Sequence, residues 1–393
     1  MRVGRVFVLF LGTLIVLSVL ELVFRLAVFP DWRIVSQVRF ETHPIYNTFQ
    51  KPNLEVRRYN PPNYDVINRT NSQGFRDRET GFKTDLNSLW ISGMSNSYGG
   101  FVENSETFSR VLQDKYGYRN ALLASEGHTL PHQVAVMRHL HRQGYRPSLV
   151  VLELTLNNVL RGYADGIIAL GKPIFVPKTA STAASERALA GVLRRVKTLW
   201  TRLLSIDFIG VKLRLINNSA IYAWAKVGVN ANPGLRDFTL KAGLRADPAL
   251  SDNVPLDMLT VKPNIMRDRL VGELADYTAL IGRWVRTTFK ADFAVVLLPS
   301  KHHMNPDWFV RYLAFRGHDG TGLDAGRPFW LLREALEQRD VPVLDVAGPI
   351  AGVKKFLNFP DDGHINAVGH ALIAEKLAAW LKTRFKREPD IGP

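Results

Sequence analysis

From residue 88 onward, short apolar runs alternate along the chain with longer stretches that carry helix-start signals. Runs rich in Val, Leu and Ile predict buried strands, and prolines or capping residues ahead of the longer stretches predict helix starts. The expected strands are 89–91, 120–124, 149–154, 293–298 and 341–345, and the expected helices are 106–116, 131–143, 266–290, 328–338 and 367–385. This alternation predicts an α/β fold with a parallel sheet between layers of helices.

Two stretches depart from this alternation. Residues 30–85 are rich in Asn, Pro, Arg and Tyr, which predicts a spacer and an irregular lead-in. Residues 160–265 predict a helical insertion between the third strand and the long helix. We therefore expect an N-terminal anchor at 1–29, the spacer at 30–85, and one domain at 86–388 that carries the insertion at about 160–265.

The insertion contains a basic stretch with helical periodicity. Apolar residues recur at helical spacing between Leu189 and Leu203, and seven cations accompany the single acid Asp207 between Arg187 and Arg214. A basic amphipathic helix can lie on an anionic membrane surface, but it can equally form a lid whose apolar stripe packs on the main domain. The two interpretations are compatible, because a lid can also touch lipid.

The first residues predict a membrane anchor. Arg2 and Arg5 precede an uncharged apolar run at 6–20, and Glu21 and Arg25 follow it four residues apart, so they can pair on one helix face. A helix that continues to the end of the anchor is long enough to span a bilayer. Basic residues ahead of the span place the N-terminus in the cytoplasm and the rest outside it. A cleaved signal peptide is the alternative, but no small-x-small cleavage site follows the run.

The composition and the net charge limit the classes of partner and ligand that we expect the protein to bind. The net charge of +15 favours anionic partners. A surface that faces an anionic membrane explains the positive net charge better than binding to nucleic acid does, because the chain has no zinc-finger pattern, no RRM-like aromatic pattern and no basic tail. Cysteine is absent, which excludes disulfides and thiolate metal sites. The histidines have no recognisable ligand spacing, so we expect neither a metal nor a cofactor.

Three residues that follow predicted strands carry groups suited to acyl transfer. Ser95 follows the first strand, Gly127 the second and Asn157 the third. Because ligands bind at the carboxyl ends of parallel strands, we expect these residues to meet at one edge of the sheet. Ser95 can act as nucleophile, and a developing oxyanion can be bound by the Ser95 and Gly127 N–H groups and the Asn157 amide. Each residue alone is also an ordinary turn residue.

Asp361 and His364 lie three residues apart just before the final helix. On a tight turn this spacing lets the carboxylate hold one imidazole nitrogen while the other nitrogen faces the serine. An imidazole is suited to taking a proton near neutral pH. The alternative is a helix-capping loop with a surface histidine. The predicted catalytic residues are therefore Ser95, His364 and Asp361.

Taken in order, these residues resemble the four blocks of the SGNH/GDSL hydrolase superfamily, in particular its membrane-anchored bacterial branch. The Gly-Asp-Ser turn of that family falls on 93–95, its glycine on Gly127, its Gly-x-Asn-Asp pattern on 155–158 and its Asp-x-x-His pattern on 361–364. The resemblance covers roughly 68–158 and 266–385. It implies a flavodoxin-like three-layer α/β/α domain, a serine ester mechanism without cofactor, and a single-pass inner-membrane protein with its domain in the periplasm.

The chain departs from the family pattern at Met94, where the family has Asp, and at Thr155 and Asn158, where it has Gly and Asp. Three functions remain open. The first is hydrolysis of acyl or acetyl esters in the cell envelope. The second is O-acyl or O-acetyl transfer to an envelope glycan. The third is a non-catalytic binding or scaffold role, which the residues at 94 and 158 motivate.

Overall fold

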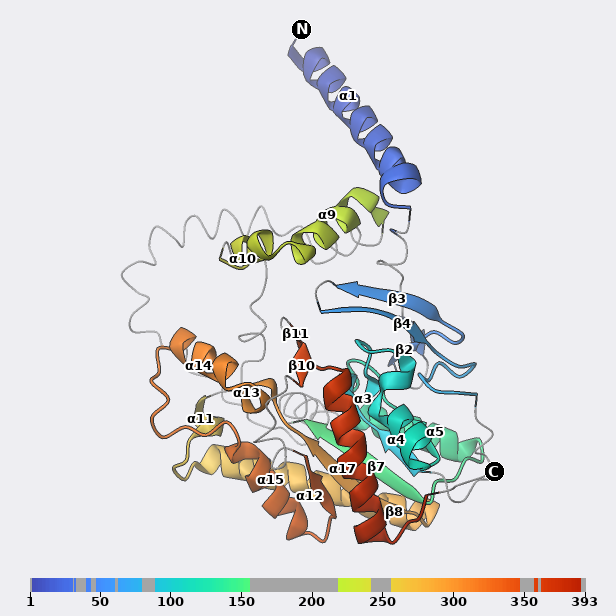
Figure 1. Ribbon diagram of the computed structural model, residues 1–393, viewed down its shortest axis with the longest axis vertical. Coiled ribbons are helices and arrows are strands. Elements are labelled where there is room, and N and C mark those ends of the chain that lie inside the picture. Colours follow the sequence, from blue (N-terminus) through green and yellow to red (C-terminus); the bar gives the residue numbers. More distant parts are fainter. Residues whose placement is uncertain are drawn as a thin grey trace. The chain divides into compact units, whose positions relative to one another are not determined.

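The computed structural model describes residues 2–30, 32, 40–43, 47–60, 63–79, 89–155, 218–241, 256–346, 357–359 and 362–389 (Figure 1). Its centre is a parallel sheet in the order β6-β5-β7-β8-β9. The strands are β5 (Leu89–Ser92), β6 (Asn120–Leu122), β7 (Leu149–Thr155), β8 (Asp292–Leu298) and β9 (Val343–Asp345). This order is the 2-1-3-4-5 arrangement of flavodoxin-like folds. The α/β class and the parallel sheet are thus confirmed.

The central strand β7 is buried along its whole length. It pairs in parallel with β5 on one side and β8 on the other, with Leu152 opposite both Ser92 and Val295. Strands covered on both faces are expected to be almost continuously apolar. Glu153 interrupts that run as a carboxylate whose residue is only 1% exposed.

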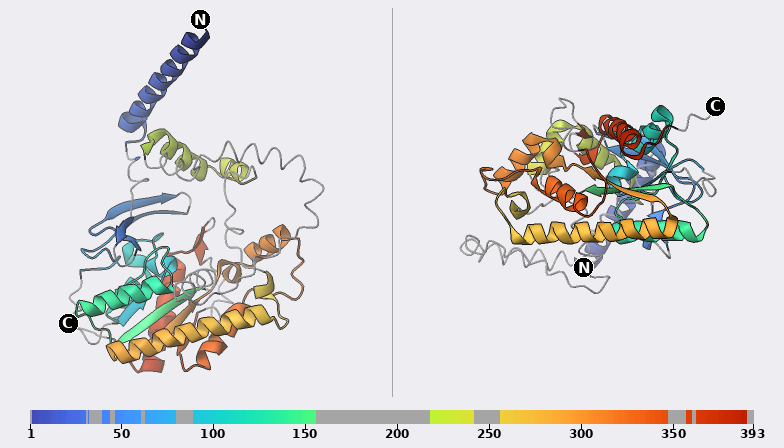
Figure 2. Two further views of the ribbon diagram at one scale, coloured as in Figure 1. Left: turned by 180° about the vertical axis from the view of Figure 1, so that it is seen from behind. Right: turned by 90° about the horizontal axis from the view of Figure 1, so that it is seen from below.

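Helices cover both faces of the sheet (Figure 2). On one face α4 (Phe108–Tyr116) packs against α17 (Ala367–Phe385). On the other face α12 (Ile265–Phe289) packs against α15 (Arg327–Glu337), and α5 (Leu130–Arg142) contacts α12 through Arg138 over the Trp284 ring. This is the three-layer arrangement that the resemblance implied.

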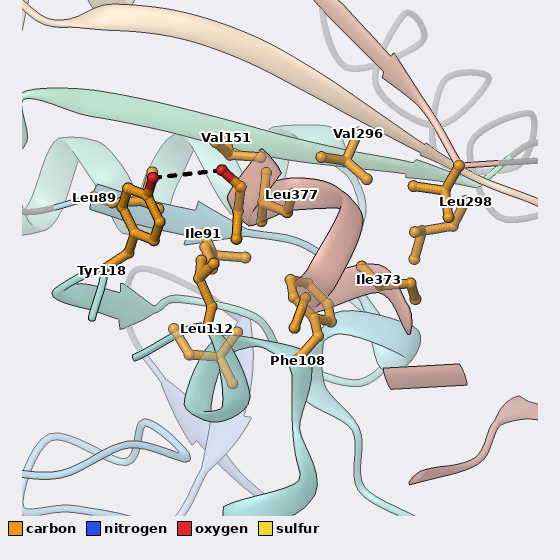
Figure 3. Close-up of a cluster of buried hydrophobic side chains, with 14 of the residues drawn as sticks. Leu89, Ile91, Phe108, Leu112, Tyr118, Val151, Val296, Leu298, Ile373 and Leu377 are labelled. Carbon is orange, nitrogen blue, oxygen red and sulfur yellow. Dashed lines mark hydrogen bonds between the residues drawn. The ribbon is translucent and has the colours of Figure 1, made fainter. Parts of the chain in front are cut away.

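The core beneath α4 and α17 shows why these segments fold together (Figure 3). Phe108 and Leu112 of α4 pack with Ile373 and Leu377 of α17 over the sheet, where Ile91 is among the buried side chains. Each large apolar side chain removed from water stabilises the fold by about 1.5–3 kcal/mol. The last helix is therefore held against the helix that follows the Ser95 turn.

The lead-in differs from the expected irregular stretch. β1 (Phe40–His43) pairs antiparallel with β2 (Asn47–Gln50), and β3 (Glu55–Asn60) forms a two-stranded sheet with β4 (Tyr64–Arg69). In β4 the buried residues Val66 and Asn68 alternate with more exposed neighbours, which is the period of a strand. A high content of Asn, Pro and Arg is typical of turns, whereas the alternation of buried and exposed side chains is the feature that matches the strands formed here.

The N-terminal helices belong to a separate compact unit, Met1–Val38, Tyr59–Pro62 and Pro173–Arg236. α1 (Arg2–Val23) continues into a π-helical turn, η1 (Phe24–Val28). The stretch Val8–Val28 is long and apolar enough to cross a membrane, a property that signal sequences share. The expected pair forms, with Glu21 and Arg25 2.8 Å apart.

In the same unit Glu21 also accepts the N–H of Ala220 at 2.6 Å, at the start of α9 (Ala220–Ala231). The basic stretch at 187–214 lies outside the described residues. The other described elements are α3 (Ser95–Tyr98), η2 (Asn104–Glu106), α10 (Pro233–Lys241), α11 (Leu256–Leu259), α13 (Lys301–Met304), α14 (Pro306–Phe315), β10 (Asn358–Phe359) and β11 (Asp362–Ile365).

Candidate active site

Ser95 opens the short helix α3, three residues beyond the end of β5. The turn is closed by two backbone hydrogen bonds, from Tyr98 N–H to Met94 O at 2.8 Å and from Gly99 N–H to Ser95 O at 3.0 Å. Gly99 has a φ of 62°, a left-handed conformation that glycine adopts without strain. Ser95 therefore lies on a tight turn at the carboxyl end of a central strand.

Glu153 of β7 lies beneath this turn. Its Oε2 accepts the N–H of Met94 at 2.8 Å and the N–H of Ser97 at 3.1 Å. A Cβ at Gly93 would collide with Glu153 Oε2 and with the Ser97 side chain, so only glycine fits there. Glu153 was not among the predicted site residues; the signal for it in the sequence is a single carboxylate inside the apolar run 149–154.

His364 lies on β11, which pairs with β10 as an antiparallel hairpin. β11 contacts α3, so the helix that begins at Ser95 and the strand that carries His364 lie side by side. The His364 ring also packs on Phe101, just beyond the turn, with ring centroids 4.1 Å apart. The structure thus brings together the serine and histidine elements, which are about 270 positions apart in the sequence.

The carboxylate bonded to His364 is Asp362. Its Oδ1 lies 2.5 Å from His364 Nδ1 and also accepts the His364 backbone N–H at 3.0 Å. Burial would raise the pKa of Asp362, but the His364 imidazole and, more weakly, Arg58 bring it below its ordinary value. Asp361, the residue predicted for this position, lies outside the described residues, so its part stays a prediction. The Asp-x-His spacing was the signal that could have identified Asp362.

Of the two further oxyanion donors, the structure describes one. Gly127 follows β6 and is itself exposed, between the half-buried Glu126 and the buried His128; its φ is 75°, and a Cβ there would meet nothing within 4 Å. Ser125 N–H donates to Gly93 O at 3.4 Å, which joins the Gly127 loop to the serine turn. Asn157 lies outside the described residues, and its predicted part as a donor is not tested by the structure.

Two arginines that were not among the predicted site residues bind side-chain and backbone groups next to Gly127 and at the end of α3. Arg58 of β3 forms an ion pair with Glu126, next to Gly127, and lies over the Phe101 ring at 4.1 Å. Arg76 is buried and donates to Tyr98 O at 2.9 Å, at the end of α3, and to Gly99 O. Burial lowers the pKa of Arg76 to about 10, so it remains a cation at neutral pH.

Within the described part of the chain, no group of three or more His, Asp or Glu residues is placed to hold a metal ion.

No family model matches the chain, and no curated protein matches it. Solved structures similar to it include a protein assigned to the SGNH hydrolases from Slackia heliotrinireducens, at 12% identity and a TM-score of 0.32, covering 74% of this chain and 97% of that one. The esterase EstA from a Pseudoalteromonas species has 12% identity and a TM-score of 0.33, with 77% and 100% covered. A carbohydrate esterase family 2 enzyme from Corynascus thermopiles has 12% identity and a TM-score of 0.36, with 76% and 67% covered.

Proposed function

We propose that the protein is a serine ester hydrolase of the SGNH/GDSL type that acts on acyl or acetyl esters of the cell envelope. The observation that carries the proposal is the contact between α3, which begins at Ser95, and β11, where His364 is hydrogen-bonded to Asp362. A nucleophile, a base and a carboxylate that orients the base are the set required for acyl transfer.

In the proposed reaction, Ser95 Oγ attacks the ester carbonyl carbon while His364 Nε2 takes the hydroxyl proton. The N–H groups of Ser95 and Gly127, with the Asn157 amide, bind the oxyanion. The C–O bond to the alcohol then breaks, and the alcohol leaves with the proton from His364. In the second half, His364 takes a proton from water, whose oxygen bonds to the acyl carbon; the bond from that carbon to Ser95 Oγ then breaks, His364 returns the proton to Oγ, and the acid leaves. Asp362 holds the imidazole through Nδ1, with Asp361 as the alternative expected from the sequence.

Labelling with a fluorophosphonate tests the chemistry. We expect the wild type to be labelled, and Ser95→Ala and His364→Ala to lose labelling. Ser72→Ala and His318→Ala are matched controls, because both residues lie outside the proposed site and should label as the wild type does. An unlabelled wild type, or labelling that persists in both site variants, would contradict the proposal.

We further propose that α1 anchors the domain at the bacterial inner membrane, with the domain in the periplasm. The apolar length of Val8–Val28 and the arginines ahead of it support this.

An envelope glycan hydroxyl can replace water in the second half-reaction, which would make the protein an acyltransferase. Incubation with an activated ester, with and without glycan acceptor, separates the two: acylated glycan indicates transfer. Complementation by Ser95→Ala would instead indicate a binding or scaffold protein.

A further inference from the structure

We propose that Glu153 positions the nucleophile, by accepting the backbone N–H groups of Met94 and Ser97 and so fixing the turn that presents Ser95. This inference rests on the proposed function. Under this proposal Glu153 is a positioning residue for Ser95, although the strand that carries it, β7, is otherwise part of the buried core.

The location of Glu153 argues against an incidental carboxylate. Every other residue of β7 is also buried, and leucine or valine would satisfy that environment without the cost of removing a carboxylate from water. Burial raises the pKa of Glu153, and its hydrogen bonds with the Ser97 and Met94 groups oppose that shift. The strand therefore carries a residue that is unfavourable for packing but suited to accepting hydrogen bonds.

The partners of Glu153 are specific to the serine turn. Oε2 takes both N–H groups, one on each side of Ser95 in the sequence, at 2.8 Å from Met94 and 3.1 Å from Ser97. Two hydrogen bonds to one oxygen fix the path of the backbone across residues 94–97. Because the Ser95 N–H is itself a proposed oxyanion donor, this fixes the nucleophile and the donor together.

The identity of residue 94 strengthens the inference. Met94 stands where the family pattern has Asp, and its buried side chain makes no capping hydrogen bond to the helix that Ser95 opens. Glu153 supplies an acceptor to the same turn from a neighbouring strand. Gly93 has no side chain at the point where Glu153 Oε2 approaches, which leaves room for this contact.

The test uses the full chain with two substitutions at Glu153. Glu153→Gln keeps an acceptor oxygen, whereas Glu153→Met has similar size and none. Hydrogen exchange of a peptide covering 93–100 should rise at least about tenfold in the Met variant and stay near wild type in the Gln variant. Fluorophosphonate labelling should slow about a hundredfold in the Met variant, the usual effect of misplacing a reacting group by about 1 Å, and less than about tenfold in the Gln variant.

For ester hydrolysis, kcat should fall in the Met variant while KM stays within about threefold, because the turn positions the nucleophile rather than binding the substrate. Asp77 is the matched control. It is also a buried carboxylate that accepts two backbone N–H groups, those of Leu122 and Arg78, but it does not bond to the serine turn. Asp77→Leu should lower stability and leave labelling and the exchange of 93–100 unchanged.

Three results would overturn the inference. These are wild-type exchange of 93–100 in Glu153→Met, a Gln variant as slow as the Met variant, or equal slowing in Asp77→Leu. If the Met variant does not fold, the Gln variant still decides, because the inference requires it to fold and to label within about tenfold of wild type. A wild type that is not labelled would refute the proposed function, and the exchange measurement would still decide whether Glu153 holds the turn.

Discussion

Removing the charge of Asp362 tests the site most directly, because the structure and the sequence pattern point to different carboxylates. Asp362 Oδ1 lies 2.5 Å from His364 Nδ1. When His364 takes the serine proton, it becomes a cation next to this carboxylate. Two unit charges about 4 Å apart interact by about 4 kcal/mol at an effective dielectric constant of about 20. The Asp362 and His364 side chains are 21% and 31% exposed, so solvent screening reduces that figure to about 2–4 kcal/mol.

Asp362→Asn should therefore slow fluorophosphonate labelling and ester hydrolysis by between about thirtyfold and about a thousandfold, because each 1.36 kcal/mol of barrier is tenfold in rate. Asp361→Asn, the matched substitution on the adjacent residue, should change either rate by less than about threefold. The assay is the second-order rate constant of labelling at neutral pH, with thermal unfolding as a folding check. If Asp361→Asn is the slow variant and Asp362→Asn labels as the wild type does, the Asp362 contact is not the catalytic one.

Three further predictions concern the support of the site and the core. Gly93→Ala should lose labelling and about 1–3 kcal/mol of unfolding free energy in urea, because its Cβ would collide with Glu153 and Ser97; wild-type stability would contradict the packing. Burial raises the pKa of Asp77 to about 6, above its value of about 3.9 in the unfolded chain. The free energy of unfolding should therefore fall by about 3 kcal/mol as the pH rises from 4 to above 6. The difference in unfolding free energy between the wild type and Asp77→Asn, measured across this range, should show that fall. Burial lowers the pKa of His370, in α17, to about 3. The neutral imidazole should therefore contribute fully to the free energy of unfolding above about pH 6.5, and that free energy should fall by about 5 kcal/mol as the pH drops toward 3. His370→Asn should remove this fall in urea titrations, and a pH profile equal to that of the wild type would refute the prediction.

Much of the fold could be predicted from local pattern. The five strands of the parallel sheet and the helices α4, α5, α12, α15 and α17 were expected within a few residues of where they occur, because buried parallel strands are mostly apolar and prolines mark the starts of α5 and α15. The shorter helices α3, α11, α13 and α14 were not expected. The strands of the lead-in were not expected. Their alternation is carried by partly polar positions such as Asn68, and short strands of that kind are identified by pairing more than by composition.

The site divides in the same way. Ser95 was expected at the end of a strand of the parallel sheet, and the structure places it there. His364 was expected from its spacing to an aspartate before the final helix, and the strand that carries it contacts α3. The catalytic roles of both residues stay predictions. Spacing alone did not identify a single partner for His364, because the sequence has aspartates both two and three residues before it; in the structure Asp362 is bonded to Nδ1. Arg76 was equally hidden, since a buried cation that binds carbonyl groups across a loop has no local signature.

Met94 shows how a departure from a motif can be interpreted physically. Met94 replaces an aspartate of the family pattern, and a thioether is a far weaker hydrogen-bond acceptor than a carboxylate. The structure shows that the backbone N–H of that residue is satisfied all the same, by a carboxylate 59 positions further along the chain at 2.8 Å. The strand that supplies this carboxylate, β7, pairs with β5 and so ends beside the turn. Loss of the motif residue therefore removes support only if no neighbouring strand supplies it, and here β7 does.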